Sequence, residues 1–143
     1  MSDDPKEEEL KQKYYELQMI QENLKQLKQQ AEALEEQGND LNAALKAVID
    51  IEKAKTGEEI MVPISSGIFI KAGIKEQKNM LVNVGANVLV KKDSEKVKEL
   101  LKDRIKTVQE YQKETAANMQ TLAKRAVVLD TELKKLVSEM KDV

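Results

Sequence analysis

The side chains best able to do acid–base chemistry in this sequence are its 26 aspartates and glutamates, because it contains no His and no Cys. The absence of these two residue types excludes disulfides, thiolate and imidazole metal ligands, and the commonest general base. Catalysis by paired carboxylates needs a dry cleft that separates their pKa values. With 35% charged and 3% aromatic residues, we expect no such cleft. We therefore predict that the chain is not an enzyme and has no catalytic residue, metal site or cofactor.

The sequence also lacks the glycine-rich motif of phosphate binding and the basic motifs of nucleic-acid binding. The five glycines are isolated, and none begins a Gly-Lys-Ser or Gly-Lys-Thr loop end. Lys91-Lys92 and Lys124-Arg125 are short basic pairs without interleaved aromatic residues, and the net charge is -2. The N-terminus is acidic, and no apolar run approaches the roughly 18 residues of a membrane span. We expect a cytoplasmic protein that binds neither nucleic acid nor membrane.

Two long stretches of the sequence carry the heptad repeat of a coiled coil. Apolar residues recur at two seam positions from Leu10 to Val48, and again from Leu101 to Val143. The first repeat fades before Gly57, and the second begins after Asp93, with Ser94 as the expected N-cap. We predict an N-terminal coiled-coil helix over residues 1–57 and a C-terminal one over residues 93–143. At about 1.5 Å per residue, each seam corresponds to roughly 70 Å of helix.

The two arms differ in charge, because the first is richer in acidic residues and the second in basic residues. Opposite charge suits two helices that lie against each other. The fold class that we predict is mainly α with a small β region: a long antiparallel two-helix coiled-coil hairpin. The alternative is that each arm pairs with another molecule.

Between the arms, residues 58–92 change to the period of two that is typical of strands. Apolar residues alternate along residues 60–64, 68–74, 80–84 and 87–91, with turns between them. Pro63 places the first strand at a sheet edge or at a bulge, because proline has no N–H. We predict four strands that form two β-hairpins.

Several of these strand residues are apolar on both faces, so other subunits must cover at least one face. We therefore predict that residues 58–92 form an oligomerisation module. The residues expected to make it are Ile60, Val62, Ile64, Ile68, Phe69, Ile70, Ile74, Met80, Leu81, Val82, Val84, Val88 and Val90.

The order helix, two hairpins, helix, together with residues 62–72 (VPISSGIFIKA) and 82–92 (VNVGANVLVKK), resembles the alpha class of the prefoldin family, of archaeal type. Where many relatives have glycine, the second turn here has Asn87, the residue after glycine that best tolerates positive φ. The resemblance implies an alpha–alpha dimer within a hexamer of two alpha and four beta-class subunits. Its hairpins would form an intersubunit β-barrel from which the coils extend.

The same resemblance implies an ATP-independent holdase chaperone, which binds non-native client proteins at the coil tips and delivers them to a group II chaperonin. The tip here comprises residues 1–20 and 129–143, where fraying would display apolar surface. Lys13 interrupts the seam there and is expected to weaken it. The expected client-binding residues are Leu10, Leu17, Ile20, Leu133, Leu136, Met140 and Val143 on the seam and Tyr14, Tyr15, Met19 and Val137 beside it.

Two alternatives remain open at this stage. Leu17, Ile20, Leu133 and Leu136 could simply be the core of the coil, and the off-seam pair Val127-Val128 could be either a further patch or ordinary helix surface. The chain could also be a structural protein related to prefoldin. It would then form filaments through open strand edges or act as a coiled-coil spacer.

Overall fold

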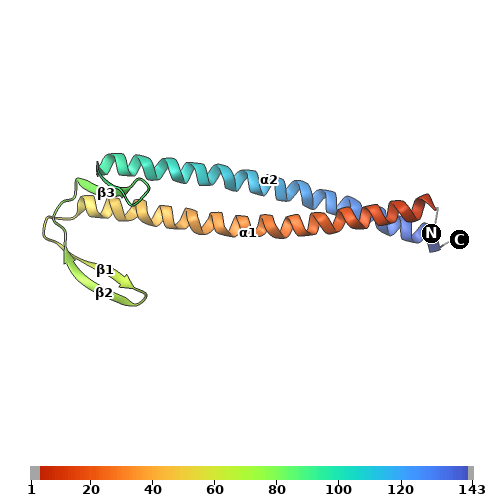
Figure 1. The fold of residues 1–143 in the computed structure, drawn as a ribbon, viewed down its shortest axis with the longest axis horizontal. Coiled ribbons are helices and arrows are strands. Elements are labelled where there is room, and N and C mark those ends of the chain that lie inside the picture. The colour runs from red at the N-terminus through yellow and green to blue at the C-terminus, as the bar shows by residue number, and fades with distance from the viewer. Residues whose placement is uncertain (1–3, 142–143) are drawn as a thin grey trace. The chain divides into compact units, whose positions relative to one another are not determined.

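The computed structural model describes residues 4–141. The described chain begins with a long helix, α1 (Pro5–Lys53), and ends with a second, α2 (Ser94–Lys141) (Figure 1). Between them in the sequence lie four strands: β1 (Glu59–Ser65), β2 (Ile68–Gly73), β3 (Asn79–Asn83) and β4 (Leu89–Asp93). The predicted order of helix, two hairpins and helix is confirmed. The chain divides into two compact units. One contains α1 as far as Glu36 and α2 from Gln109 onward, and the other contains residues Gln37–Val108. We call them the tip unit and the base unit.

Both helices begin with an aspartate that caps the first turn. Asp4 Oδ1 accepts a hydrogen bond from the N–H of Lys6 at 3.0 Å, and Pro5 fills the first helical position. At the start of α2, Asp93 Oδ1 accepts from the N–H of Glu95 at 2.8 Å. The predicted cap, Ser94, is instead buried and donates its hydroxyl to Glu52 Oε2 at 3.0 Å. Ser94 therefore joins the two helices, and the residue before it caps α2.

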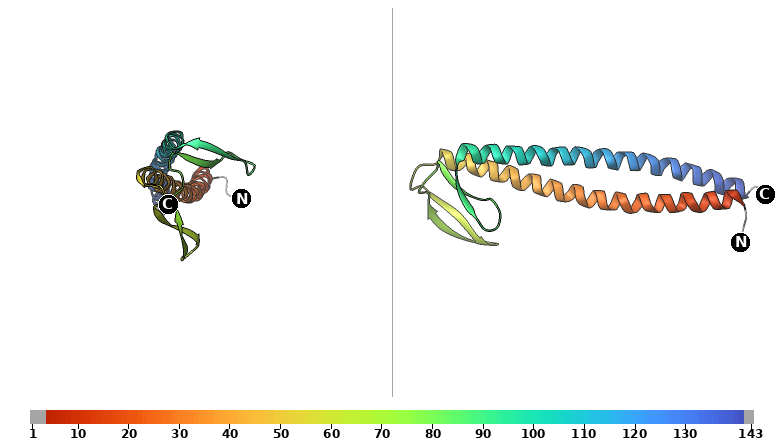
Figure 2. Two further views of the ribbon diagram at one scale, coloured as in Figure 1. Left: turned by 90° about the vertical axis from the view of Figure 1, so that its left-hand side faces the viewer. Right: turned by 45° about the horizontal axis from the view of Figure 1, so that its top comes forward.

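In the tip unit, the first part of α1 lies beside the last part of α2, running in the opposite direction (Figures 1 and 2). Their seam buries Ile20, Leu129, Leu133 and Leu136, of which Leu129 has no exposed surface. Each residue comes from a seam position of the heptads, as coiled-coil packing requires. The arms of one chain therefore pair with each other here, and the alternative of pairing with another molecule is not needed to bury this seam.

The core of the base unit combines both helices with one strand. Val48, Val97 and Leu101 are buried together, and the partly buried Met80 and Val82 of β3 pack against them. Met80 and Val82 are alternate residues, so they lie on one face of β3, as the period of two predicts. One face of β3 is thus partly covered within the chain. Leu41, Ala44 and Leu45 complete the contacts around this cluster.

The hairpins are two separate two-stranded antiparallel sheets, β1 with β2 and β3 with β4 (Figure 2). Val62 lies opposite Ile70 in the first, and Val82 lies opposite Val90 in the second. The register of the first hairpin shifts between Pro63 and Ser65. Such an irregularity is where a strand tolerates proline, so the expectation from Pro63 is confirmed.

A tight turn between Gly85 and Val88 joins β3 to β4. The N–H of Val88 donates to the carbonyl oxygen of Gly85 at 2.9 Å, and the central residues, Ala86 and Asn87, have φ of 50° and 60°. Positive φ at both central positions defines the type I′ turn that suits the twist of a hairpin. Asn87 tolerates this conformation, as expected from its type. Ala86 does not, because its Cβ is crowded by the backbone.

We predict that Ala86→Gly stabilises the protein. Glycine removes about 1–2 kcal/mol of left-handed strain, which exceeds the roughly 0.4–1 kcal/mol that its extra freedom in the unfolded chain costs. Urea unfolding followed by circular dichroism should therefore show a free energy of unfolding higher by about 0.5–1 kcal/mol. Gly67→Ala is the matched opposite change, since Gly67 has φ of 80° and open space where a Cβ would lie. It should lower stability, and equal effects of the two changes would contradict the account of Ala86.

Candidate interaction surfaces

Apolar side chains of the strands are largely uncovered in the base unit. Phe69 is 53% exposed and Leu81 67% exposed, although a free-standing chain gains by burying such residues. Of the predicted oligomerisation residues, those exposed are Ile64, Ile68, Phe69, Ile70, Leu81, Val84, Val88 and Val90. The partly buried ones are Ile60, Val62, Met80 and Val82, and Ile74 is buried within the chain. This surface is a candidate for contact with other chains.

Two exposed apolar strand residues escaped the sequence analysis. Met61 of β1 is 60% exposed and Leu89 of β4 is 57% exposed. Both lie within stretches predicted as strands, but alternation counted from Ile60 and Val88 placed them on the opposite face. Because a two-stranded ribbon has two open faces, every apolar residue on either face should have been counted.

At the tip, the seam is closed. Ile20, Leu133 and Leu136 are 4–8% exposed, and Leu10, Leu17 and Met140 are partly buried. Val143, the last predicted member of this set, lies outside the described residues. The reading of Ile20, Leu133 and Leu136 as the core of the coil agrees with this burial. Their side chains cannot meet another molecule unless the helices separate.

Residues beside the seam are open instead. Tyr14, Tyr15 and Met19 are about half exposed or more, and Val137 is partly buried. Tyr14 and Val137 line a groove of about 360 Å³ together with Leu17 and Leu133. Asp130 and Lys134 complete its wall. We call it the apolar groove, because four of its six lining residues are aliphatic or aromatic. Val127 and Val128 are also exposed, on α2.

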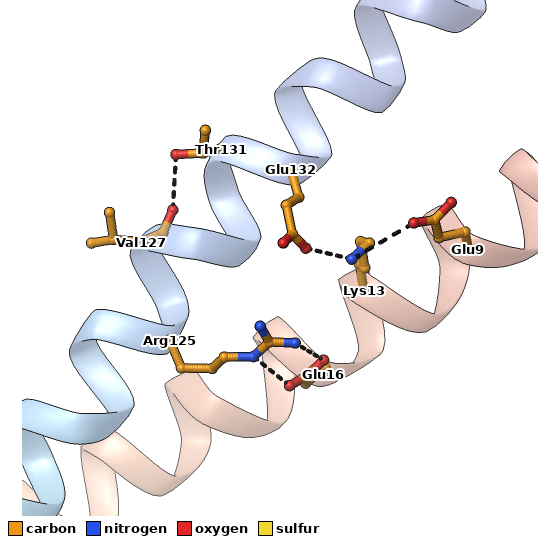
Figure 3. A network of polar contacts seen from close by, with 7 residues as sticks. All are labelled: Glu9, Lys13, Glu16, Arg125, Val127, Thr131 and Glu132. Atoms are coloured by element: carbon orange, nitrogen blue, oxygen red, sulfur yellow. Dashed lines mark hydrogen bonds and ion pairs between the residues drawn. The ribbon is translucent and has the colours of Figure 1, made fainter.

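A network of ion pairs joins the helices beside the same seam (Figure 3). Arg125 holds Glu16 in a two-pronged contact, with Nε and Nη2 at 2.9 and 3.1 Å from the two carboxylate oxygens. Lys13 Nζ donates a hydrogen bond to Glu132 Oε2 across the seam and lies 3.8 Å from Glu9 Oε1 on its own helix. Lys13 was expected to weaken the seam, but its ammonium group finds a carboxylate on the opposite helix. These ion pairs therefore join α1 to α2 in the tip unit.

Hydrogen bonding in this network favours the charged forms. The bond from Lys13 holds the pKa of Glu132 below its usual value, and the same bond raises the pKa of Lys13. The bond from Arg125 likewise lowers the pKa of Glu16. Each helix has two seam positions per heptad: Leu17 and Leu133 occupy the first, and Lys13 and Leu136 the second. Glu16 and Glu132 each precede a residue at the first position, whereas Tyr14 and Val137 each follow a residue at the second. Heptad geometry places these two sets on opposite sides of the seam.

Residues 4–141 hold no cluster of three or more carboxylates that could bind a metal ion. Within the same range, neither helix is apolar enough over its length to cross a membrane.

The chain is similar to known proteins over most of its length. Residues 20–139 match the family described as Prefoldin subunit. A protein of Methanococcus aeolicus named Prefoldin subunit alpha is 29% identical over 136 residues, which cover 93% of this chain and 90% of that protein. A protein of the same name from Methanoregula boonei is 33% identical over 113 residues, 75% of this chain and 74% of that one.

The fold is also that of a solved structure, filamentous PFD from Methanocaldococcus jannaschii determined by cryo-EM. The TM-score is 0.63 at 16% sequence identity, with 90% of this chain and 94% of the other covered. Two long helices, two intervening hairpins and a family match over most of the chain lead to one conclusion: the protein belongs to the prefoldin family, among the alpha subunits of archaeal type, which are chaperones.

Proposed function

We propose that this chain is the alpha subunit of a cytoplasmic, ATP-independent holdase. It would bind non-native proteins at its tip, keep them from aggregating and deliver them to a group II chaperonin, acting by binding alone. The observation that carries the proposal is the apolar groove of the tip. Tyr14, Leu17 and Val137 leave apolar surface open at the helix ends, beside the buried Leu133, where a large and irregular partner could reach it.

Client contact would use the groove rather than a separated seam. Separating the helices would expose Leu129, Leu133 and Leu136 to water, at up to about 1.5–3 kcal/mol for each side chain, and would also break the pairs of Lys13 with Glu132 and Arg125 with Glu16. The groove is open without this cost. Tyr14 offers an apolar ring with a polar end, and Met19 an adaptable thioether chain, so both suit clients of varied sequence.

Assembly would rest on the exposed strand residues. We propose two copies of this chain, meeting as an alpha–alpha dimer, with four beta-class subunits in a hexamer. Phe69 and Leu81 would be covered by strands of neighbouring subunits in a shared β-barrel, which would also pair the free strand edges. The same edges support a second candidate, a structural filament, because strands can also add one after another without closing.

We predict that Tyr14→Ser combined with Val137→Ser impairs client binding but leaves assembly intact. In the assembled complex, about fivefold more protein should be needed to suppress aggregation of a chemically denatured protein without nucleotide, because roughly 1 kcal/mol of apolar contact is lost. Light scattering of the denatured protein measures this. Tyr111→Ser is the matched control, since Tyr111 is as exposed as Tyr14 but lines no part of the apolar groove.

The tip is not the client site if suppression survives the more drastic change. Assemblies whose copies of this chain lack residues 1–20 and 130–143 should lose this subunit's share of the suppression. Full suppression by them would overturn the proposal, as would an equal loss in the Tyr111→Ser control.

We predict that the tip loosens in acid. Because the folded pKa values of Glu16 and Glu132 lie below 4.5, their pairs stabilise the fold above about pH 4.5, and this contribution is lost as pH falls through the lowered values. The melting temperature should therefore fall on the acid side more steeply in the wild type than in Glu16→Gln with Glu132→Gln. Glu22→Gln with Glu36→Gln removes two exposed glutamates of α1 as a control and should keep the steep fall. Parallel curves for all three proteins would show that the network does not hold the tip.

A further inference from the structure

A second groove lies in the tip unit, farther from the helix ends than the apolar groove. It has a volume of about 400 Å³, within the range of ligand pockets. Two leucines, Leu27 and Leu122, contribute apolar surface, and the other lining residues are uncharged and polar: Asn23, Gln26, Gln30, Asn118 and Thr121. We call it the amide groove.

The amide groove offers hydrogen-bonding groups that the fold does not use. Each Asn or Gln side chain presents two N–H donors and one carbonyl acceptor. Across residues 4–141, the amides of Asn23, Gln26, Gln30 and Asn118 have no hydrogen-bond partner in the protein. Only Thr121 is engaged, through a bond from its hydroxyl to the carbonyl oxygen of Ala117 at 3.0 Å. The groove is thus lined with neutral donors and acceptors that are available to a ligand.

The lack of charge distinguishes this stretch from the same side of the coil nearer the helix ends. Asn23 follows Glu16 by one heptad, and Asn118 precedes Arg125 by one heptad. The equivalent positions thus carry an ion pair in one place and amides in the other. Since none of the groove's seven residues is charged in a chain that is 35% charged, an anion or a cation would find no counter-charge. A neutral ligand with its own donors and acceptors fits better.

The spacing of Gln26 and Gln30 matches the repeat of an extended polypeptide. Gln26 and Gln30 are separated by about 6 Å along the helix axis. In an extended chain, groups on one side recur about every 6.6 Å. A strand laid along the groove would therefore place two successive groups of one edge beside Gln26 and Gln30, while side chains on its inner face lie against Leu27 and Leu122.

We propose that the amide groove binds an extended stretch of non-native polypeptide through its backbone. Bonds to peptide N–H and C=O groups are independent of sequence, which a holdase with varied clients requires. The inference rests on the proposed binding of non-native proteins. It adds a contact with the client's backbone, made by parts of α1 and α2 that lie outside residues 1–20 and 129–143. The apolar groove selects carbon surface, whereas the amide groove recognises the extended chain itself.

The test uses a fluorescent, end-blocked peptide of alternating Ser and Leu and the full chain. A second peptide of the same sequence carries a methyl group on every second backbone nitrogen, which removes donors without changing a side chain. Fluorescence anisotropy should show about tenfold weaker binding of the methylated peptide, because at least two hydrogen bonds are lost. Equal binding of the two peptides, or no binding of either, would overturn the proposal.

Variants locate the site. Gln26→Glu with Gln30→Glu should weaken binding of the unmethylated peptide about tenfold, because each change removes donors and adds a charge. Gln18→Glu with Gln29→Glu makes the same change in charge at exposed positions of α1 outside the groove and should change binding less than about twofold. Circular dichroism confirms that both variants remain helical. Equal weakening by the two pairs would show that charge alone acts, and would overturn the proposal.

The apolar-groove variant separates this inference from the proposed function. Tyr14→Ser with Val137→Ser removes apolar contact with the leucines of the peptide but leaves the amide groove unchanged, so it should keep the roughly tenfold preference for the unmethylated over the methylated peptide. If that variant loses the preference while the Gln26 and Gln30 variant keeps it, the amide groove is not a polypeptide site, although the holdase proposal stands. If the peptide binds in the amide groove but aggregation is not suppressed, the holdase proposal fails and the site remains.

Discussion

The structure depends on one constraint: a two-stranded ribbon with apolar residues on both faces cannot bury them alone. In β2, Ile68 and Ile70 lie on one face and Phe69 on the other, and all three are exposed. A ribbon of this size is at best marginally stable in water. Within the base unit, Met80 and Val82 of β3 find cover on the helices, but Leu81, between them, does not. The chain therefore closes the seam of its tip unit by itself, and we propose that other chains cover its strands.

Periodicity was sufficient to predict the elements and much of the seam. Heptads pointed to Ile20, Leu133 and Leu136, and alternation pointed to both hairpins. Contacts between residues far apart in sequence were harder. Lys13 looked like a defect because a heptad reports one helix at a time, whereas its partner, Glu132, lies on the other helix. Ser94 looked like a cap because its type favours capping, but burial against Glu52 gave its hydroxyl a different acceptor.

The tip unit presents three kinds of surface along its two helices: ion pairs, uncharged amides and apolar side chains. On one side of the seam, Glu16 and Arg125 form an ion pair, and one heptad farther along Asn23 and Asn118 replace it with amides. On the other side, Tyr14 and Val137 leave apolar surface open. Because the buried seam and the ion pairs hold the helices together, these surfaces are present without local unfolding. A holdase built this way would bind through side chains beside the seam and keep its coil intact.

The central claim, that the strands of this chain need other chains, is tested most directly by the mass of its assemblies. Light scattering of the chain alone, and mixed with a beta-class prefoldin subunit, reports that mass. The account predicts that the chain associates in both samples and that the mixture gives one closed particle of two copies of this chain and four of its partner. Open polymers of varied length would favour the structural filament. A chain that stays at its single-copy mass of 16.2 kDa, alone and in the mixture, would contradict the account.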